Sequence, residues 1–200
     1  MKPRIIYYSC LLSLSFYLLI ISAGLLKGDG HYIFDTTIFI FITLFFYHTY
    51  EKRQIKPYHY ILLNTIMIMH SLGRFGAFNW TIWLFHWDVI THIAASFVIT
   101  LFFNHFLRNA NLSTTNKYLL LIIISLGIAT IGELTEFAGA VTTPNGQGIL
   151  GVESRGSPIP WLSPDYWDTM KDLVMNGVGT LLSLASIIII EHKKNKQKFI

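Results

Sequence analysis

Long apolar stretches, separated by short polar connections, follow one another along the whole chain. Six of these stretches approach or exceed the roughly 18 residues that indicate a membrane-spanning helix. The pattern predicts an all-α fold, a polytopic transmembrane helical bundle of about six spans in a single domain over residues 1–200. The predicted spans are about 5–26, 32–50, 57–72, 88–106, 117–140 and 168–190, and the longest connection is 141–167.

The first and third stretches are the least regular. The first follows Lys2 and Arg4 and contains the small residues 22–24, features that a secretory signal peptide shares. Its apolar run is longer than a typical signal core, so we expect a retained first span. The third is interrupted by Asn64 and His70, which makes it the weakest of the six predicted spans.

The composition agrees with a membrane protein and narrows the classes of partner. Of the 200 residues, 52% are hydrophobic and 13% are charged, and a soluble domain carries about 25% charged residues. The one cysteine, Cys10, excludes an internal disulfide and a metal cluster held by cysteines. The formal net charge of +4 comes mostly from the chain ends and two loops, so it reports on topology rather than on nucleic acid binding. We expect a multi-pass protein of the cell membrane whose partners are membrane lipids.

The basic residues set the expected orientation. Eleven of the 15 lysines and arginines lie before the first span, between spans two and three, between spans four and five, or after the sixth. Lys and Arg are enriched in cytoplasmic loops, so both termini are predicted to be cytoplasmic. The four basic residues on the other side are Lys27, Arg74, Arg155 and Lys171.

Polar side chains within the spans gather at the ends that this topology places on the extracytoplasmic side. They recur at steps of three or four residues, so those of one span share a helix face. At 1.5 Å per residue they lie within about 10 Å of the outer surface. Acids inside a span are costly and usually face a bundle interior or a wet cavity. The set consists of His70, Asp88, His92, Glu133, Glu136, Asp168, Asp172 and Asn176.

Each of these residues also has an ordinary explanation, because polar groups are tolerated at helix ends near the headgroups. Asp88 and Asp168 fit an N-terminal cap or a first turn, where the helix dipole stabilises negative charge. Glu133 and Glu136 lie near a C-terminal end, where the dipole disfavours it. Five carboxylates in one layer repel one another unless protons, cations or a basic ligand neutralise them. The set therefore predicts a site more strongly than any single member does.

Two arrangements would neutralise the layer. In the first, side chains four residues apart on two helices hold a divalent metal such as Mg, Mn, Zn or ferrous Fe, and Glu133 or Glu136 acts as a catalytic base. In the second, a hydrogen-bonded and partly protonated core fixes the helix packing or holds a polar headgroup. The metal ligands of the first arrangement would be Asp88, His92, Asp168 and Asp172, with His70 as a further candidate.

The connection 141–167 is the only long segment predicted to lie outside the membrane. Its glycines and prolines indicate successive turns rather than a helix. It could cover the polar layer as a lid, with Arg155 as an anion contact, or serve as a plain connector with Arg155 in solvent. In the lid interpretation, Arg155 and Asn176 bind the substrate.

The polar residues form motifs whose order can be compared with known families over roughly 64–182. The motifs are Asp88-x-x-x-His92, Gly132-Glu133-x-x-Glu136, Arg155 and Asp168-x-x-x-Asp172-x-x-x-Asn176-x-x-Gly179. This order resembles that of the VanZ-like membrane proteins. The segment 167–172, WDTMKD, with His70 ahead of it, is similar to the YjdF-like inner-membrane proteins. The VanZ-like resemblance implies a part in tolerance to lipid-anchored glycopeptide antibiotics, and no enzymatic activity is secure for either family.

The leading functional hypothesis is an integral membrane protein with a polar or metal-binding site open to the outer leaflet. Such a site would bind, and in an enzymatic version modify, a lipid, glycolipid or cell-envelope headgroup. The alternative is a non-catalytic membrane protein whose acid cluster binds a ligand or orders the helix bundle. Proton or cation transport is disfavoured, because no polar path continues from the outer layer to the cytoplasmic side.

Overall fold

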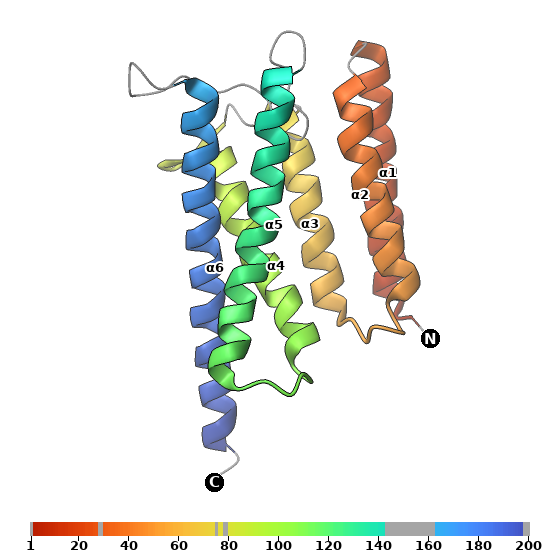
Figure 1. Cartoon of the computed structure of the whole chain (residues 1–200). Coiled ribbons are helices and arrows are strands. Elements are labelled where there is room, and N and C mark those ends of the chain that lie inside the picture. Colours follow the sequence, from red (N-terminus) through yellow and green to blue (C-terminus); the bar gives the residue numbers. More distant parts are fainter. Residues whose placement is uncertain (1, 28–29, 75, 78–79, 143–162, 198–200) are drawn as a thin grey trace.

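In the part of the chain that the structure describes, six α-helices run side by side along the length of the molecule (Figure 1). The computed structural model describes residues 2–27, 30–74, 76–77, 80–142 and 163–197. The helices confirm the expected all-α bundle. In chain order they are α1 (Arg4–Lys27), α2 (Gly30–Thr49), α3 (Pro57–Arg74), α4 (Trp87–Leu107), α5 (Thr114–Thr142) and α6 (Pro164–Gln197).

Among the described residues, four of the helices contain segments long and apolar enough to cross a membrane. These segments lie in α1, α4, α5 and α6, whereas α2 offers the shorter apolar stretch Ile33–Thr49. The chain therefore has the helices of a multi-pass membrane protein. The number of six spans and the cytoplasmic placement of both termini stay predictions. The four long segments are Arg4–Leu26, Trp87–Leu107, Thr114–Gly139 and Tyr166–Lys193.

The bundle is apolar outside and partly polar inside. Large aliphatic side chains face outward on the long helices, such as Leu26, which is 90% exposed, and Ile131, which is 68% exposed. Buried hydroxyl and amide groups pair between helices instead, as Thr43 does with Asn64 at 2.7 Å. Lipid tails solvate aliphatic side chains, while a polar group needs a partner inside the bundle, so this distribution is that of a membrane bundle.

Helix α4 holds the C-terminal half of the bundle together. It packs against α3, α5 and α6, and its contact with α6 is the most extensive of all. Gly179 of α6 permits this contact, because a Cβ atom there would overlap the backbone carbonyl of Ile93 on α4. Gly177, two residues earlier, has open space around it: a Cβ atom there would meet nothing within 4 Å, so this glycine does not permit a close helix contact.

The connections differ from the sequence prediction in two places. Helix α6 begins at Pro164 and α5 extends to Thr142, so the connection is shorter than 141–167 at both ends. Asp168 consequently lies in the second turn of α6 and is neither a cap nor a first-turn acid, whereas Asp88 is in the first turn of α4. The main part of the connection lies outside the described residues.

A short β-hairpin precedes α4. Strand β1 (Thr81–Ile82) pairs antiparallel with β2 (Phe85–His86). The two residues between the strands are Trp83 and Leu84, and Trp83 has a positive φ of 60°. Hairpin turns of this length usually contain glycine or asparagine at such a position, so the sequence carried no signal for this hairpin.

Candidate functional site

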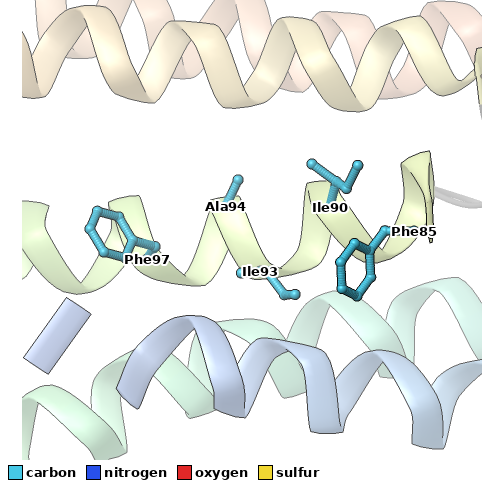
Figure 2. Close-up of a pocket in the computed structure, with 5 residues that line it drawn as sticks. All are labelled: Phe85, Ile90, Ile93, Ala94 and Phe97. Atoms are coloured by element: carbon cyan, nitrogen blue, oxygen red, sulfur yellow. The ribbon is translucent and has the colours of Figure 1, made fainter. Parts of the chain in front are cut away.

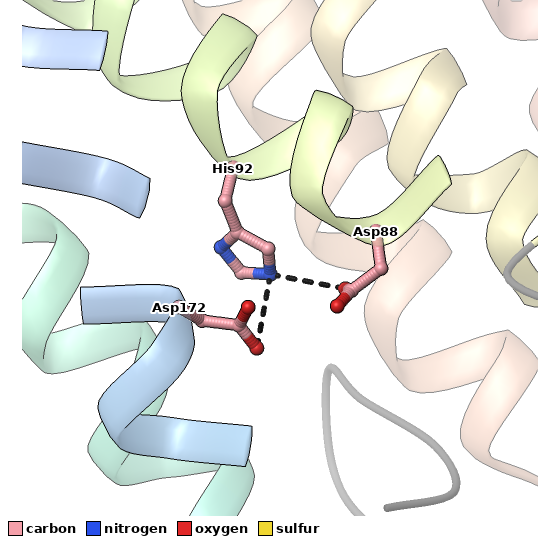
Figure 3. Close-up of side chains that lie close together, drawn as sticks. All are labelled: Asp88, His92 and Asp172. Atoms are coloured by element: carbon pink, nitrogen blue, oxygen red, sulfur yellow. Dashed lines mark ion pairs between the residues drawn. The ribbon is translucent and has the colours of Figure 1, made fainter. Parts of the chain in front are cut away.

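The N-terminal parts of α4 and α6 bring three predicted metal ligands together. Asp88 and His92 extend from one face of α4, and Asp172 reaches them from α6 (Figure 3). The His92 Nε2 atom lies 3.3 Å from Asp88 Oδ1 and 3.6 Å from Asp172 Oδ2. One ligand atom from each residue falls within 4.8 Å of the others. The three atoms are thus close enough to share one ion.

The opposite nitrogen of His92 faces a carboxylate of α5. His92 Nδ1 lies 3.1 Å from Oε1 of Glu133, a residue that is 4% exposed. An ionised carboxylate only accepts hydrogen bonds, so this contact places a proton on Nδ1. The other nitrogen, Nε2, faces two further carboxylates, those of Asp88 and Asp172, so it needs either a second proton, which makes the ring a cation, or a bound metal ion. A proton on Nδ1 with the lone pair of Nε2 on a metal is the tautomer of a metal-binding histidine.

An amide and a hydroxyl group hold this carboxylate in place. Asn176 Nδ2 donates a hydrogen bond to Glu133 Oε1 at 3.1 Å and lies 3.3 Å from His92 Nδ1. The Ser96 hydroxyl donates to Asn176 Oδ1 at 2.7 Å. Asn176 is 3% exposed, so its hydrogen bonds to Glu133 and Ser96 are shielded from water. The buried end of the site is therefore a connected network across α4, α5 and α6.

Lys171 covers the opposite, more accessible end. Its Nζ atom lies 2.7 Å from Asp88 Oδ2, 2.6 Å from Asp168 Oδ1 and 3.4 Å from Asp172 Oδ1. The side chains of Lys171 and Asp168 are 21% and 22% exposed, compared with 2% for Asp172. The site thus opens towards Lys171 and Asp168 and closes towards Glu133.

Asp172 is the least satisfied polar group of the site. The residue is 1% exposed, and its Oδ1 atom accepts no hydrogen bond from any residue that the structure describes. Buried carboxylate oxygens nearly always have a hydrogen-bond donor or a cation. The nearby cation is the Lys171 ammonium, 3.4 Å from this oxygen, and the same carboxylate contributes to the three-residue ligand group.

The site also carries an excess of negative charge. Asp88, Glu133, Asp168 and Asp172 face one ammonium group, that of Lys171, and an imidazole. Even a protonated His92 would leave more carboxylates than cations. Excess charge in a shielded site requires extra protons or a bound cation, because an uncompensated buried ion is unstable by several kcal/mol, on the order of 3–5.

A comparison with models of protein families found one match for the chain. The family model described as "Predicted membrane protein (DUF2238)" matches residues 8–193. The chain belongs to the DUF2238 family of predicted membrane proteins. The match includes all the helices that build the site, and it confirms a membrane protein without describing a chemistry. Searches of the curated proteins and of the solved structures found no match.

Within this DUF2238 chain, the remaining predicted site residues differ in their relation to the central group. Asp168 belongs to the site through Lys171 and is outside the three-residue ligand group. Glu136 is half-buried one turn beyond Glu133, close enough for the charges of Glu133 and Asp172 to repel it. His70 sits on α3, where its ring meets that of Phe39 edge-on at 5.5 Å between centroids. Arg155 lies outside the described residues.

Two contributions to the site did not follow from sequence reasoning. Lys171 was counted only as one of a few nearby basic residues, although it bridges three carboxylates. Ser96 was missed entirely. A signal for Ser96 exists, since Asp88, His92 and Ser96 follow one another at steps of four and so share one face of α4.

Proposed function

We propose that the DUF2238 chain binds a divalent cation between α4 and α6 and uses it to hold a lipid or cell-envelope headgroup. The observation that carries the proposal is the convergence of Asp88, His92 and Asp172. One buried oxygen of Asp172 accepts no hydrogen bond among the described residues and lies 3.4 Å from the Lys171 ammonium. Two carboxylates and one imidazole suit Mn, ferrous Fe or Zn better than Mg, which prefers oxygen ligands.

Glu133 fits the role of an orienting group better than that of a catalytic base. Its Oε1 atom is engaged by both His92 and Asn176. A carboxylate bonded to the far nitrogen of a metal-binding histidine fixes the ring and raises its basicity. In an enzymatic version of the proposal, Glu136 is then the carboxylate left to activate water.

The open end of the site supports a headgroup ligand. Lys171 and Asp168 are its most accessible members, and an ammonium beside a divalent cation attracts phosphate or carboxylate groups. With both termini in the cytoplasm, this end faces the outer leaflet. Arg155, in the connection between α5 and α6, would then add a second cationic contact. The resemblance to VanZ-like and YjdF-like proteins supports the same location for the site.

The contacts of Lys171 favour a second candidate function. Its ammonium already lies within 2.7 Å of two carboxylates, so the cluster could be an internal ion-pair network that orders the bundle. The two candidates differ in the negative charge that protons must compensate. With four ionised carboxylates and Lys171, a metal-free network has an excess of about three negative charges, or two if His92 is protonated, whereas a bound divalent cation leaves an excess of about one.

Metal content tests the proposal directly. The protein is purified in detergent, dialysed against a limiting mixture of Mg, Mn, Fe and Zn, and assayed for bound metal by mass spectrometry. We expect about one ion per chain in the wild type and at least a tenfold loss in Asp172→Asn. Glu191→Gln is the matched control, because Glu191 is on the same helix and pairs with Lys117 at 2.6 Å. A wild type without metal would refute the cation site and leave the structural network.

A further inference from the structure

A second pair of metal-ligating side chains lies at the opposite end of α4 from the polar site. His105 is in the last turn of α4, and His59 is in the first turn of α3, the helix that packs beside it. The centroids of the two rings are 5.0 Å apart, and the ring planes are inclined by 58°. The two imidazoles therefore meet across the seam between α3 and α4.

The ring of His59 is buried and incompletely paired. The residue is 5% exposed, and its Nδ1 atom has no hydrogen-bond partner among the residues that the structure describes. Buried polar atoms nearly always have such a partner or bind an ion. A neutral imidazole has one nitrogen with a free lone pair, which is the form in which histidine binds metals. A metal ion beside this ring would satisfy the unpaired nitrogen.

Aromatic rings enclose the pair. The centroid of the His59 ring lies 4.1 Å from that of Tyr58 and 6.1 Å from that of Phe102. The His105 ring meets Phe106 edge-on at 5.4 Å. Among the described residues, the one group of three or more histidine, cysteine or acidic ligands is the group at the polar site, so no third ligand of these types joins the two histidines. The pair thus offers two neutral nitrogen ligands in apolar surroundings.

These surroundings favour an ion of low charge. Lys56 lies three residues before His59 and holds its ammonium 5.8 Å from the centre of the Tyr58 ring, so a fixed positive charge is near the pair. Burying an ion without a counter-charge becomes more costly as its charge rises. Imidazole suits copper, zinc, iron and nickel. Of these metals copper alone is commonly monovalent, and monovalent copper is stable with two nitrogen ligands.

We infer that His59 and His105 bind one cuprous ion between α3 and α4. An imidazole nitrogen lies about 2 Å from a metal such as zinc, so two nitrogens on opposite sides of a similar ion are about 4 Å apart. Rings whose centroids are 5.0 Å apart can reach this separation by rotation of the side chains. This site is independent of the proposed cation site, which has two acids and one imidazole at the other end of α4.

The apolar pocket of α4 does not compete for such an ion. It is lined by Phe85, Ile90, Ile93, Ala94 and Phe97 (Figure 2). None of these side chains has a nitrogen, oxygen or sulfur atom that could bind a metal. The thiol of Cys10 is a competing ligand by its chemistry, because thiolates select monovalent copper. The experiment must therefore separate the histidine pair from Cys10.

Titration with cuprous ions tests the inference. Full-length protein in detergent is titrated with Cu⁺ in the presence of ascorbate, in competition with a chromogenic cuprous chelator. We expect one ion per chain, and a loss of affinity of roughly tenfold or more in both His59→Gln and His105→Gln. His48→Gln is the matched control, because His48 is an exposed histidine in the last turn of α2. X-ray absorption of the wild type should show two nitrogen ligands.

Two further variants locate the copper. Cys10→Ala and Asp172→Asn should both bind Cu⁺ as the wild type does, so this site and the proposed cation site can fail separately. If His59→Gln elutes as aggregate, the part-buried His105→Gln carries the test. Binding that survives both histidine substitutions, or that is lost in Cys10→Ala or Asp172→Asn, would overturn the inference. A wild type that binds no Cu⁺, or that prefers Zn²⁺ at equal concentration, would overturn it as well.

Discussion

His92 Nδ1 lies 3.1 Å from Glu133 Oε1, so a carboxylate of α5 determines which nitrogen of an α4 histidine faces the open acids of α4 and α6. The two residues are 41 positions apart in the sequence. Asp172 of α6 lies near the other nitrogen, so side chains of α4, α5 and α6 surround one imidazole. The orientation of His92 therefore depends on the assembled bundle, with Nδ1 towards the buried Glu133 and Nε2 towards the more accessible acids near Lys171.

Glu133→Gln should weaken cation binding without removing a ligand. A glutamine side chain can still accept a hydrogen bond from Nδ1, but it lacks the charge that raises the basicity of the ring. Loss of such supporting groups reduces metal affinity by about 10- to 100-fold. Isothermal titration of the purified protein with Mn or Zn measures the effect. An unchanged affinity would mean that Glu133 does not support His92 in this way.

Lys171→Met should strengthen cation binding while destabilising the metal-free protein. The ammonium lies near both Asp88 and Asp172, so it competes with a divalent ion for the same oxygens. Its removal leaves these acids without their counter-ion until a metal binds. We expect at least tenfold tighter binding by titration and a lower melting temperature in chelator. A lower melting temperature that added metal does not restore would favour the ion-pair network as the function of the cluster.

Gly179→Ala should loosen the seam between α4 and α6. The new methyl group would overlap the backbone carbonyl of Ile93, which cannot move away as a side chain can. Overpacking of this kind typically costs about 1–3 kcal/mol. Thermal unfolding in detergent should show a clear loss of stability. Gly177→Ala is the matched control, because its new methyl group meets nothing within 4 Å and should leave the melting temperature unchanged or slightly higher.

The expected topology can be tested with introduced cysteines. The native Cys10 is buried at 5% exposure, so it should not react with an impermeant maleimide. Asn111, between α4 and α5, and Ser163, just before α6, are both exposed. With both termini in the cytoplasm, Ser163→Cys should be labelled in intact cells and Asn111→Cys only after lysis. The reverse pattern would place the polar site at the cytoplasmic face.

Features that depend on spacing within one helix could be predicted from the sequence. The apolar runs predicted the six helices to within a few residues at most ends, because each run needs only its own backbone hydrogen bonds to be satisfied. The step of four between Asp88 and His92, and between Asp168 and Asp172, placed each pair on one face. The match to the DUF2238 family supports the predicted membrane class, and it does not confirm the resemblance to VanZ-like or YjdF-like proteins.

Only the tertiary structure decided how those faces meet. Lys171 became the internal counter-ion of Asp88 because α6 packs against α4 in one register, and the contact of Gly179 with Ile93 sets that register. The hairpin before α4 could not be predicted from the sequence, since its turn lacks the glycine or asparagine that usually marks such a turn. Helical periodicity is local, so it specifies which residues share a face, whereas contacts between helices depend on close packing of residues far apart in the chain.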